Sequence, residues 1–195
     1  MQEAATFPGP GTVTSVNLSA RKTIRKTRGT EWVLIEDLGF EGDAHAGDWH
    51  RQVSLLAQES IDSMVAKGLD VKAGDFAENI TTLGIDLLAL PVGSVIRIGD
   101  EAVVEVSQIG KVCHAKCAIY YQAGDCVMPR EGIFGVVRHG GAVRAGDVIV
   151  TVSLGDGTCD RTPEEAIREF AEERAKEAAL IERAAAIGVD TAAGK

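Results

Sequence analysis

Short apolar segments separated by glycine-containing turns, about seven of them between residues 12 and 153, set the strongest limit on how this chain can fold. The stretch 12–19 alternates polar and apolar residues, and the runs 32–35 and 53–57 are apolar. One helix is clear in this region, with Ser60 as its N-cap and Gly68 as its stop. Because strands and helices do not alternate regularly, the pattern favours a mostly β fold, an antiparallel barrel or sandwich with few short helices.

Turn residues predict how some of these strands connect. Gly99-Asp100 precedes a clean strand over 101–109, and the segment 90–93, Leu-Pro-Val-Gly, is typical of a turn. The last two strands, 132–137 and 148–152, are separated by HGGAVRAGD. That spacing predicts that these two strands pair as a hairpin with a glycine-dependent turn.

The composition changes after the last strand. Thr162 and Pro163 provide an N-cap and a first helical residue, and the glutamates that follow suit the positive end of a helix dipole. The predicted helix runs to about Gly188 and has one weakly apolar stripe, which we expect to dock on the β domain or on a second copy of the chain, giving a homo-oligomer. We divide the chain into a flexible N-terminus (1–11), a β domain (12–153) and a linker with an acidic C-terminal α-helix (154–195).

Charge and hydropathy exclude several classes of function. The net charge of −9 and the pI near 4.9 argue against nucleic acid as a partner, because phosphates require a basic face. No apolar run is long enough to span a membrane and the N-terminus lacks a secretory apolar segment, so we expect a cytoplasmic protein. The basic segment 20–29 predicts an exposed loop or hairpin, since its charges cannot be buried unpaired, and it leaves room for an anion site.

The segment 107–134 contains three of the four cysteines and both tyrosines. A structural zinc site is not expected, because only Cys113 and Cys117 are closely spaced and Cys126 stands alone. Cys126 is predicted to pack as a small apolar residue. Cys113 lies between Lys111 and His114, and neighbouring cations lower the pKa of a thiol, so this residue is a candidate nucleophile or metal ligand.

Two further segments carry polar residues next to predicted strands. The glycine-rich stretch 39–51 contains Asp43, His45, Asp48, His50 and Arg51, which either form a pocket rim or are turn formers and solvated side chains. Glu78 and Asn79 lie between a Gly-Asp turn and an apolar strand. They can reach a ligand or bond the local backbone.

Several of these motifs, taken in order, resemble the MOSC domain, the molybdenum-cofactor sulfurase C-terminal domain. The resemblance covers roughly residues 12–152, is strongest to the small stand-alone bacterial type, and rests on these stretches: GFEGDAHAG, VSLLAQES, FAENITTLGIDL, LPVGSVIRIGD, SQIGKVCHAKC and GDCVMPREGIFGVVRHGGAVRAGD. It implies a β-barrel with a pocket for the molybdenum cofactor, a pterin dithiolene that bears a phosphate. Family-level descriptions also mention pyridoxal phosphate, although no pyridoxal-phosphate-dependent sulfurase domain is expected here.

The resemblance also implies roles for particular residues. The family's shared cysteine carries sulfur or binds molybdenum, and the motif of Ser, Gln, four residues and Cys places it at Cys113, while a second motif fits Cys117. We favour Cys113 as the metal ligand and keep both as candidate catalytic residues. The other carry-overs are candidate cofactor-binding residues: Asp43, His45, Glu78, Asn79, Lys111, His114 and Arg130. For Arg130, contact with the phosphate and a salt bridge to Glu131 remain alternatives.

Three functions follow from these expectations. The first is a molybdenum-cofactor-binding or sulfur-carrier protein that uses a reactive cysteine and meets a sulfur-donor protein. The second is a molybdenum-dependent reductase of N-hydroxylated compounds. The third is a non-catalytic module that binds the cofactor or an anion.

Overall fold

The computed structural model describes residues 7–22, 25–111, 118–124 and 126–164, together with residues 166, 168, 175 and 179. Three predicted site residues, Cys113, His114 and Cys117, lie outside the described residues, as does most of the helix predicted from Thr162 onward. The strands and helices of the described part are β1 Gly11–Leu18, β2 Thr27–Gly29, β3 Glu31–Ile35, β4 Gly39–Phe40, β5 Val53–Ala57, α1 Gln58–Ala66, β6 Ile80–Leu83, η1 Leu87–Ala89, β7 Val95–Ile98, β8 Ala102–Ile109, α2 Ala118–Ala123, α3 Met128–Glu131, β9 Ile133–His139, β10 Gly141–Arg144 and β11 Val148–Ser153.

Seven of these strands close into a barrel in the order β11-β7-β8-β9-β5-β6-β1, and β1 pairs with β11 to complete the ring. The closing register places Gly11 opposite Ile149. Neighbouring strands are antiparallel except for β5 and β6, which are parallel because α1 carries the chain back between them. The predicted mostly β barrel is therefore confirmed, with one parallel pair.

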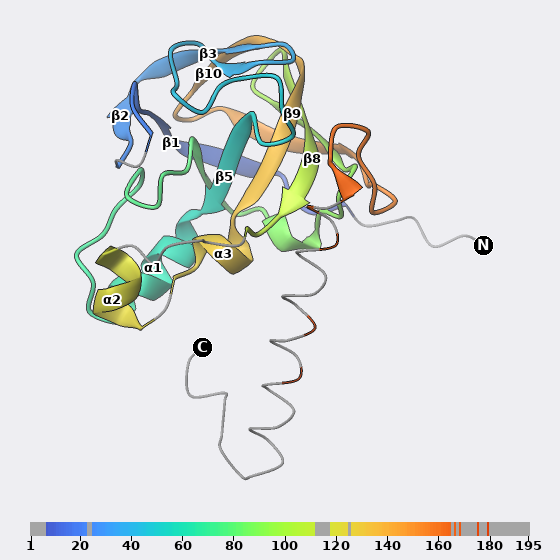
Figure 1. The fold of residues 1–195 in the computed structure, drawn as a ribbon. Helices are drawn as coiled ribbons and strands as arrows, with labels where there is room; N and C mark the ends of the chain where they lie inside the picture. The colour runs from blue at the N-terminus through green and yellow to red at the C-terminus, as the bar shows by residue number, and fades with distance from the viewer. Residues whose placement is uncertain are drawn as a thin grey trace.

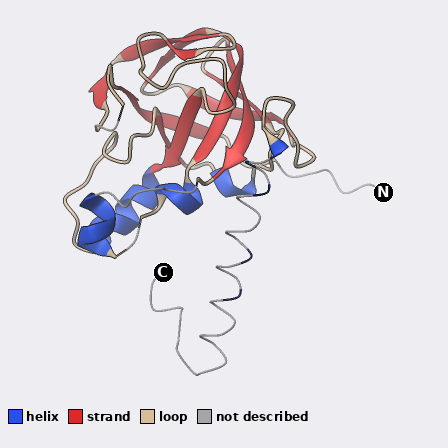
Figure 2. Cartoon of the chain, viewed as in Figure 1, coloured by secondary structure: helices blue, strands red, loops and turns tan. Residues whose placement is uncertain are grey.

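Smaller elements cover the two ends of the barrel (Figures 1 and 2). A second sheet, in the order β10-β3-β4, lies at one end, and α1, α2 and α3 gather at the other. Among the described residues, no helix is long and apolar enough to cross a membrane.

Apolar side chains form two clusters. The larger fills the barrel with residues such as Leu55, Ile80 and Val104. The smaller packs α1 and α3 against the outer face of β5 and β9, and it includes Cys126, which is 9% exposed. The prediction that Cys126 packs as an apolar residue is confirmed.

The predicted hairpin of 132–137 with 148–152 is wrong. β9 lies between β8 and β5, while β11 lies between β7 and β1, so both edges of each strand are already paired. The intervening residues 141–144 form β10 instead, which pairs with β3 in the second sheet. Local turn chemistry identified the glycines correctly but could not show which strand edges were available.

The helix start at Ser60 is also wrong. α1 begins at Gln58 directly after β5, its N-cap is Ala57 without a side-chain hydrogen bond, and Ser60 is a buried residue inside the helix. By contrast, the turn at 90–93 is confirmed, because Ser94 N donates to Pro91 O at 3.0 Å and Gly93 has a φ of +87°.

Candidate functional site

A buried ion pair forms the centre of the candidate site. Lys26 Nζ lies 2.7 Å from Asp43 Oδ2, and both side chains are 1% exposed. Arg21, Lys22, Arg25 and Arg28 are exposed, so for the basic residues of this segment, all of which the structure describes, the prediction of exposure is wrong at Lys26 alone. The rule behind that prediction still holds, because Lys26 is buried with a partner that comes from a different loop.

Asp43 receives several further hydrogen bonds. Its Oδ1 accepts from His45 N at 2.8 Å and lies 3.2 Å from His45 Nδ1, while its Oδ2 accepts from Ser19 N at 3.1 Å. Burial alone would raise the pKa of Asp43, but the bonds from His45 and the charge of Lys26 outweigh it and hold the pKa below its ordinary value. Burial lowers the pKa of Lys26, and the attraction of Asp43 opposes that shift. Asp43 is thus a structural carboxylate, not only a turn former.

Asn79 connects this pair to the barrel. Its Nδ2 donates to Asp43 Oδ2 and to Asn17 O, both at 3.3 Å. Its Oδ1 accepts from Ser54 N at 3.1 Å and from Ser54 Oγ at 3.0 Å. The Asn79 side chain therefore joins β1, β5 and the loop of residues 42–51, which we call the 42–51 loop. We call Lys26, Asp43, Asn79, Asn17 and Ser54 the Asp43 network.

Glu78, the neighbour of Asn79, is fully buried and turned toward its own loop. Its Oε1 accepts from Gly74 N at 2.5 Å and from Thr81 Oγ1 at 2.9 Å, while Oε2 has no hydrogen-bond partner among the described residues. Burial raises the pKa of Glu78. Of the two alternatives for Glu78, bonding of the local backbone describes this geometry, and a role in cofactor binding stays a prediction.

We expect Glu78→Gln to gain stability relative to the parent protein, by roughly 1–2 kcal/mol, as the pH rises from acid to above neutral, because the amide keeps the Oε1 acceptor and avoids a buried charge. In acid the parent should be the more stable protein, because the amide nitrogen takes the place of Oε2, which has no partner among the described residues. The folded protein holds the Glu78 proton to a higher pH than the unfolded chain does. Stability therefore falls as the pH rises above 4.5, the ordinary pKa of the group, and this loss is absent in the variant. Urea unfolding at several pH values measures both effects. The exposed Glu41→Gln is the matched control, and an equal pH dependence in both variants would contradict the prediction.

A second group of contacts attaches the 42–51 loop to the end of β8. Ser107 Oγ donates to His50 O, and His50 Nε2 lies 2.9 Å from Gln108 Oε1. Gln108 Nε2 also donates to Gly110 O at 2.8 Å. Burial lowers the pKa of His50, which favours the neutral imidazole. Ser107 and Gln108, which precede Cys113 in the sequence, thus hold this loop in place.

Two cations gather at the ring of Phe134 beside these contacts. The Arg51 guanidinium lies 5.7 Å from the centroid of that ring and 4.8 Å from the centroid of Trp49, and Lys111 Nζ lies 5.9 Å from Phe134. Phe134 therefore brings Lys111, two residues before Cys113, near Arg51 of the 42–51 loop.

The remaining predicted residue, Arg130, is in α3. Its Nη2 lies 4.0 Å from Glu131 Oε1, which is a weak pair, so both alternatives for its role stay open. Sequence reasoning missed Asn17 and Ser54 as members of the network, and it treated Lys26 only as an exposed charge. Their signal in the sequence is weak, because their partners are 17 to 62 positions away.

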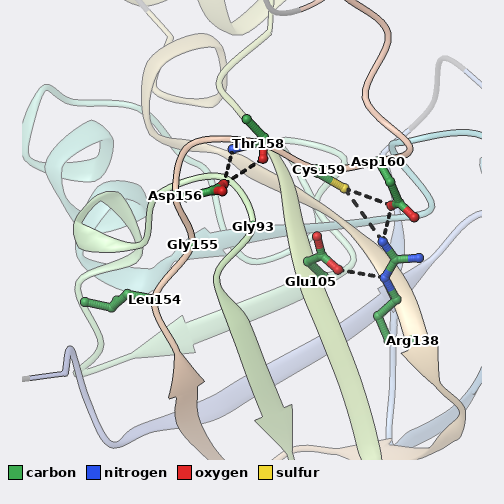
Figure 3. Close-up of a pocket in the computed structure, with 9 residues that line it drawn as sticks. All are labelled: Gly93, Glu105, Arg138, Leu154, Gly155, Asp156, Thr158, Cys159 and Asp160. Atoms are coloured by element: carbon green, nitrogen blue, oxygen red, sulfur yellow. Dashed lines mark hydrogen bonds and ion pairs between the residues drawn. The ribbon is translucent and has the colours of Figure 1, made fainter.

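A separate open depression of about 460 Å³ lies where residues 154–160 cross β8 and β9 (Figure 3). Its wall includes Glu105, Arg138, Cys159 and Asp160. The sulfur and the carboxylate oxygens lie within 4.8 Å of one another, but Arg138 already pairs with both acids and contacts the sulfur. Burial raises the pKa of Cys159, so its thiol is not an activated nucleophile.

The chain thus forms a small closed β-barrel domain whose candidate site lies on the outer face of the barrel and is built mainly from loop residues. The MOSC domain model matches residues 42–150, more than half of the chain, and the protein belongs to this family, which is associated with binding of the molybdenum cofactor.

Solved structures agree with this assignment at the level of the fold. YuaD from Bacillus subtilis has a TM-score of 0.62 and 18% identity, with 72% of this chain and 94% of that chain covered. YiiM from Geobacillus stearothermophilus has a TM-score of 0.60 and 18% identity, with 84% and 98% covered. YiiM from Escherichia coli has a TM-score of 0.53 and 23% identity, with 83% and 76% covered. A search of curated protein sequences gives no match.

Proposed function

We propose that the protein binds the molybdenum cofactor and that Cys113 supplies the sulfur that binds molybdenum or is carried to the cofactor. The observation that supports this most is the meeting of three separate sequence elements, because the 42–51 loop contacts both 78–79 and 107–111. Lys111 stands two residues before Cys113 in the sequence and lies beside Phe134, as does Arg51 of the 42–51 loop. Lys111 and the loop that carries Asp43 and His45, residues that the family resemblance selects, therefore meet at Phe134, which supports the proposal.

Two cationic side chains at this place suit the anionic part of the cofactor. Arg51 and Lys111 bring two positive charges to the ring of Phe134, and such charges suit a phosphate group. His50 is bonded to Gln108 and kept neutral, so it orients the loop without adding charge. When bound, the cofactor supplies the molybdenum centre, and a soft thiolate is a suitable ligand for that metal. The residues of this chain would position the cofactor and hold the 42–51 loop against the end of β8.

The test is metal and pterin analysis of protein purified from a molybdenum-replete host. We expect molybdenum and pterin in the wild-type protein and a loss of molybdenum on the order of tenfold or more in Cys113→Ala, because a ligand is removed. Cys126→Ala is the control for removal of a thiol that packs in the core.

Two results would count against the proposal. Wild-type protein without molybdenum and pterin would overturn it, and loss of molybdenum in Cys117→Ala but not in Cys113→Ala would move the sulfur to Cys117. An electron-donor assay with an N-hydroxylated purine on the same samples separates a carrier from a reductase, because a pure carrier gives no turnover.

A further inference from the structure

Residues 154–162, which we call the strap, follow the last barrel strand and run outside the part of the chain that matches the family model. The first half of the strap is attached to the turn before β7. Gly155 N donates to Ser94 Oγ and Gly157 N donates to Val92 O, both at 2.9 Å. A Cβ on Gly93 would lie only 2.4 Å from Thr158 O, so the strap and this turn are in close contact.

The middle of the strap is held by an ion-pair group on β8 and β9 (Figure 3). Arg138 pairs with Asp160 of the strap and, at 2.7 Å, with Glu105 of β8. Cys159 is 7% exposed beneath these groups. The strap is thus packed on the barrel up to Asp160.

The last two residues of the strap contact the candidate site from two sides. Arg161 pairs with Asp48, in the middle of the 42–51 loop, and at 2.7 Å with Asp37. The buried hydroxyl of Thr162 donates to Ser107 O at 2.6 Å. Ser107 in turn donates to His50 O. A continuous chain of contacts therefore runs from the strap to His50 and Gln108.

The geometry points to Arg161 and Thr162 as positioning residues that fix the 42–51 loop against the end of β8. Arg161 holds the loop through Asp48, and Thr162 holds the β8 residue to which His50 is bonded. A binding loop that is held in one conformation before its ligand arrives pays less ordering entropy on binding. Because both carboxylates that pair with Arg161 are exposed, we expect its removal to free the loop without unfolding the barrel.

Amide hydrogen exchange on protein without cofactor tests this inference independently of the proposed function. The amides of Ala44 and Gly47 are bonded to Ser19 O and Leu38 O, both at 2.8 Å, so they report on the loop. In the double variant Arg161→Ala/Thr162→Val we expect exchange within 42–51 to become about tenfold faster or more, with β5 and β9 unchanged.

Two controls separate positioning from a general loss of stability. Thr162→Ser alone should keep the parent exchange rate, because it retains the hydroxyl, and Arg144→Ala removes an exposed pair with Glu31 in the second sheet. Unchanged exchange in 42–51 together with faster exchange in the strap would overturn the inference. Protein that lacks molybdenum yet shows the faster exchange would contradict the proposed function alone.

Discussion

Asp43→Asn should lower the free energy of unfolding by roughly 3–5 kcal/mol near neutral pH, because it leaves the buried Lys26 ammonium without its counter-charge. Lys26 Nζ and Asp43 Oδ2 are 2.7 Å apart in a place that water does not reach, as both side chains are 1% exposed. The variant is isosteric, so the loss reports on charge and hydrogen bonding and not on a cavity. Denaturant unfolding followed by circular dichroism measures it.

Two comparisons define that effect. Asp48→Asn, in the same loop but 84% exposed at the side chain, should cost no more than about 1 kcal/mol. Lys26→Met/Asp43→Asn should lose less than Asp43→Asn alone, because it removes the ammonium that the single variant leaves without a counter-charge, and the amide oxygen still accepts hydrogen bonds. A loss below about 1 kcal/mol in Asp43→Asn would show that the pair is solvated.

The pH dependence has a definite sign. The pKa of Asp43 is lower in the folded protein than in the unfolded chain, so its stabilising effect is complete above the ordinary value of 3.8 and is lost as the pH falls below it. The difference between parent and variant should therefore be constant around neutral pH and shrink only in strong acid.

The strands could be predicted from the sequence where local pattern and burial agree. The run 53–57 coincides with β5, since it is apolar except for Ser54 and is buried on both faces, by the barrel on one side and by α1 and α3 on the other. Which strands pair with each other was harder to predict from the sequence. The hairpin expected near the C-terminus failed because β10 finds its partner more than a hundred positions earlier, in β3.

The site shows the same division between residue identity and arrangement. Asp43 and Asn79 were selected from short motifs, but their direct contact and the burial of Lys26 depend on how two loops meet over β1. Glu78 and Asn79 are neighbours in the sequence with different environments. Asn79 faces the ion pair, whereas Glu78 turns to Gly74 and Thr81. No local pattern separates them, because the difference comes from loop backbone geometry such as the φ of +64° at Ala77.

Asn79→Asp should destabilise the protein by about 3 kcal/mol or more near neutral pH, although it only replaces the side-chain NH2 group by an oxygen. Asn79 Nδ2 donates to two acceptors, Asp43 Oδ2 and Asn17 O, each at 3.3 Å. An aspartate would place a second carboxylate oxygen against the Asp43 carboxylate, while its other oxygen still accepts from Ser54. The hydrogen bond becomes a repulsion between like charges in a buried place.

Acid should relieve this penalty. Repulsion and burial raise the pKa of the introduced carboxyl in the folded state, so the loss of stability grows as the pH rises above the ordinary aspartate value and fades below it. Gln58→Glu on α1 is the matched control, because Gln58 Nε2 donates to Asp62 Oδ1 at 2.8 Å on the exposed surface. There the same exchange of amide for carboxylate should cost only about 0.5 kcal/mol.

A double variant then tests whether Asp43 and Asn79 act on each other directly. Asp43→Asn/Asn79→Asp moves the carboxylate across the 3.3 Å contact and keeps one donor facing one acceptor, with one negative charge near Lys26. Residues in direct contact show coupling free energies of about 0.5–3 kcal/mol. The double variant should therefore be more stable than the sum of the single losses predicts. A strictly additive result would mean that the two side chains stabilise their loops independently. The Asp43 network would then consist of two separate groups of contacts that lie side by side.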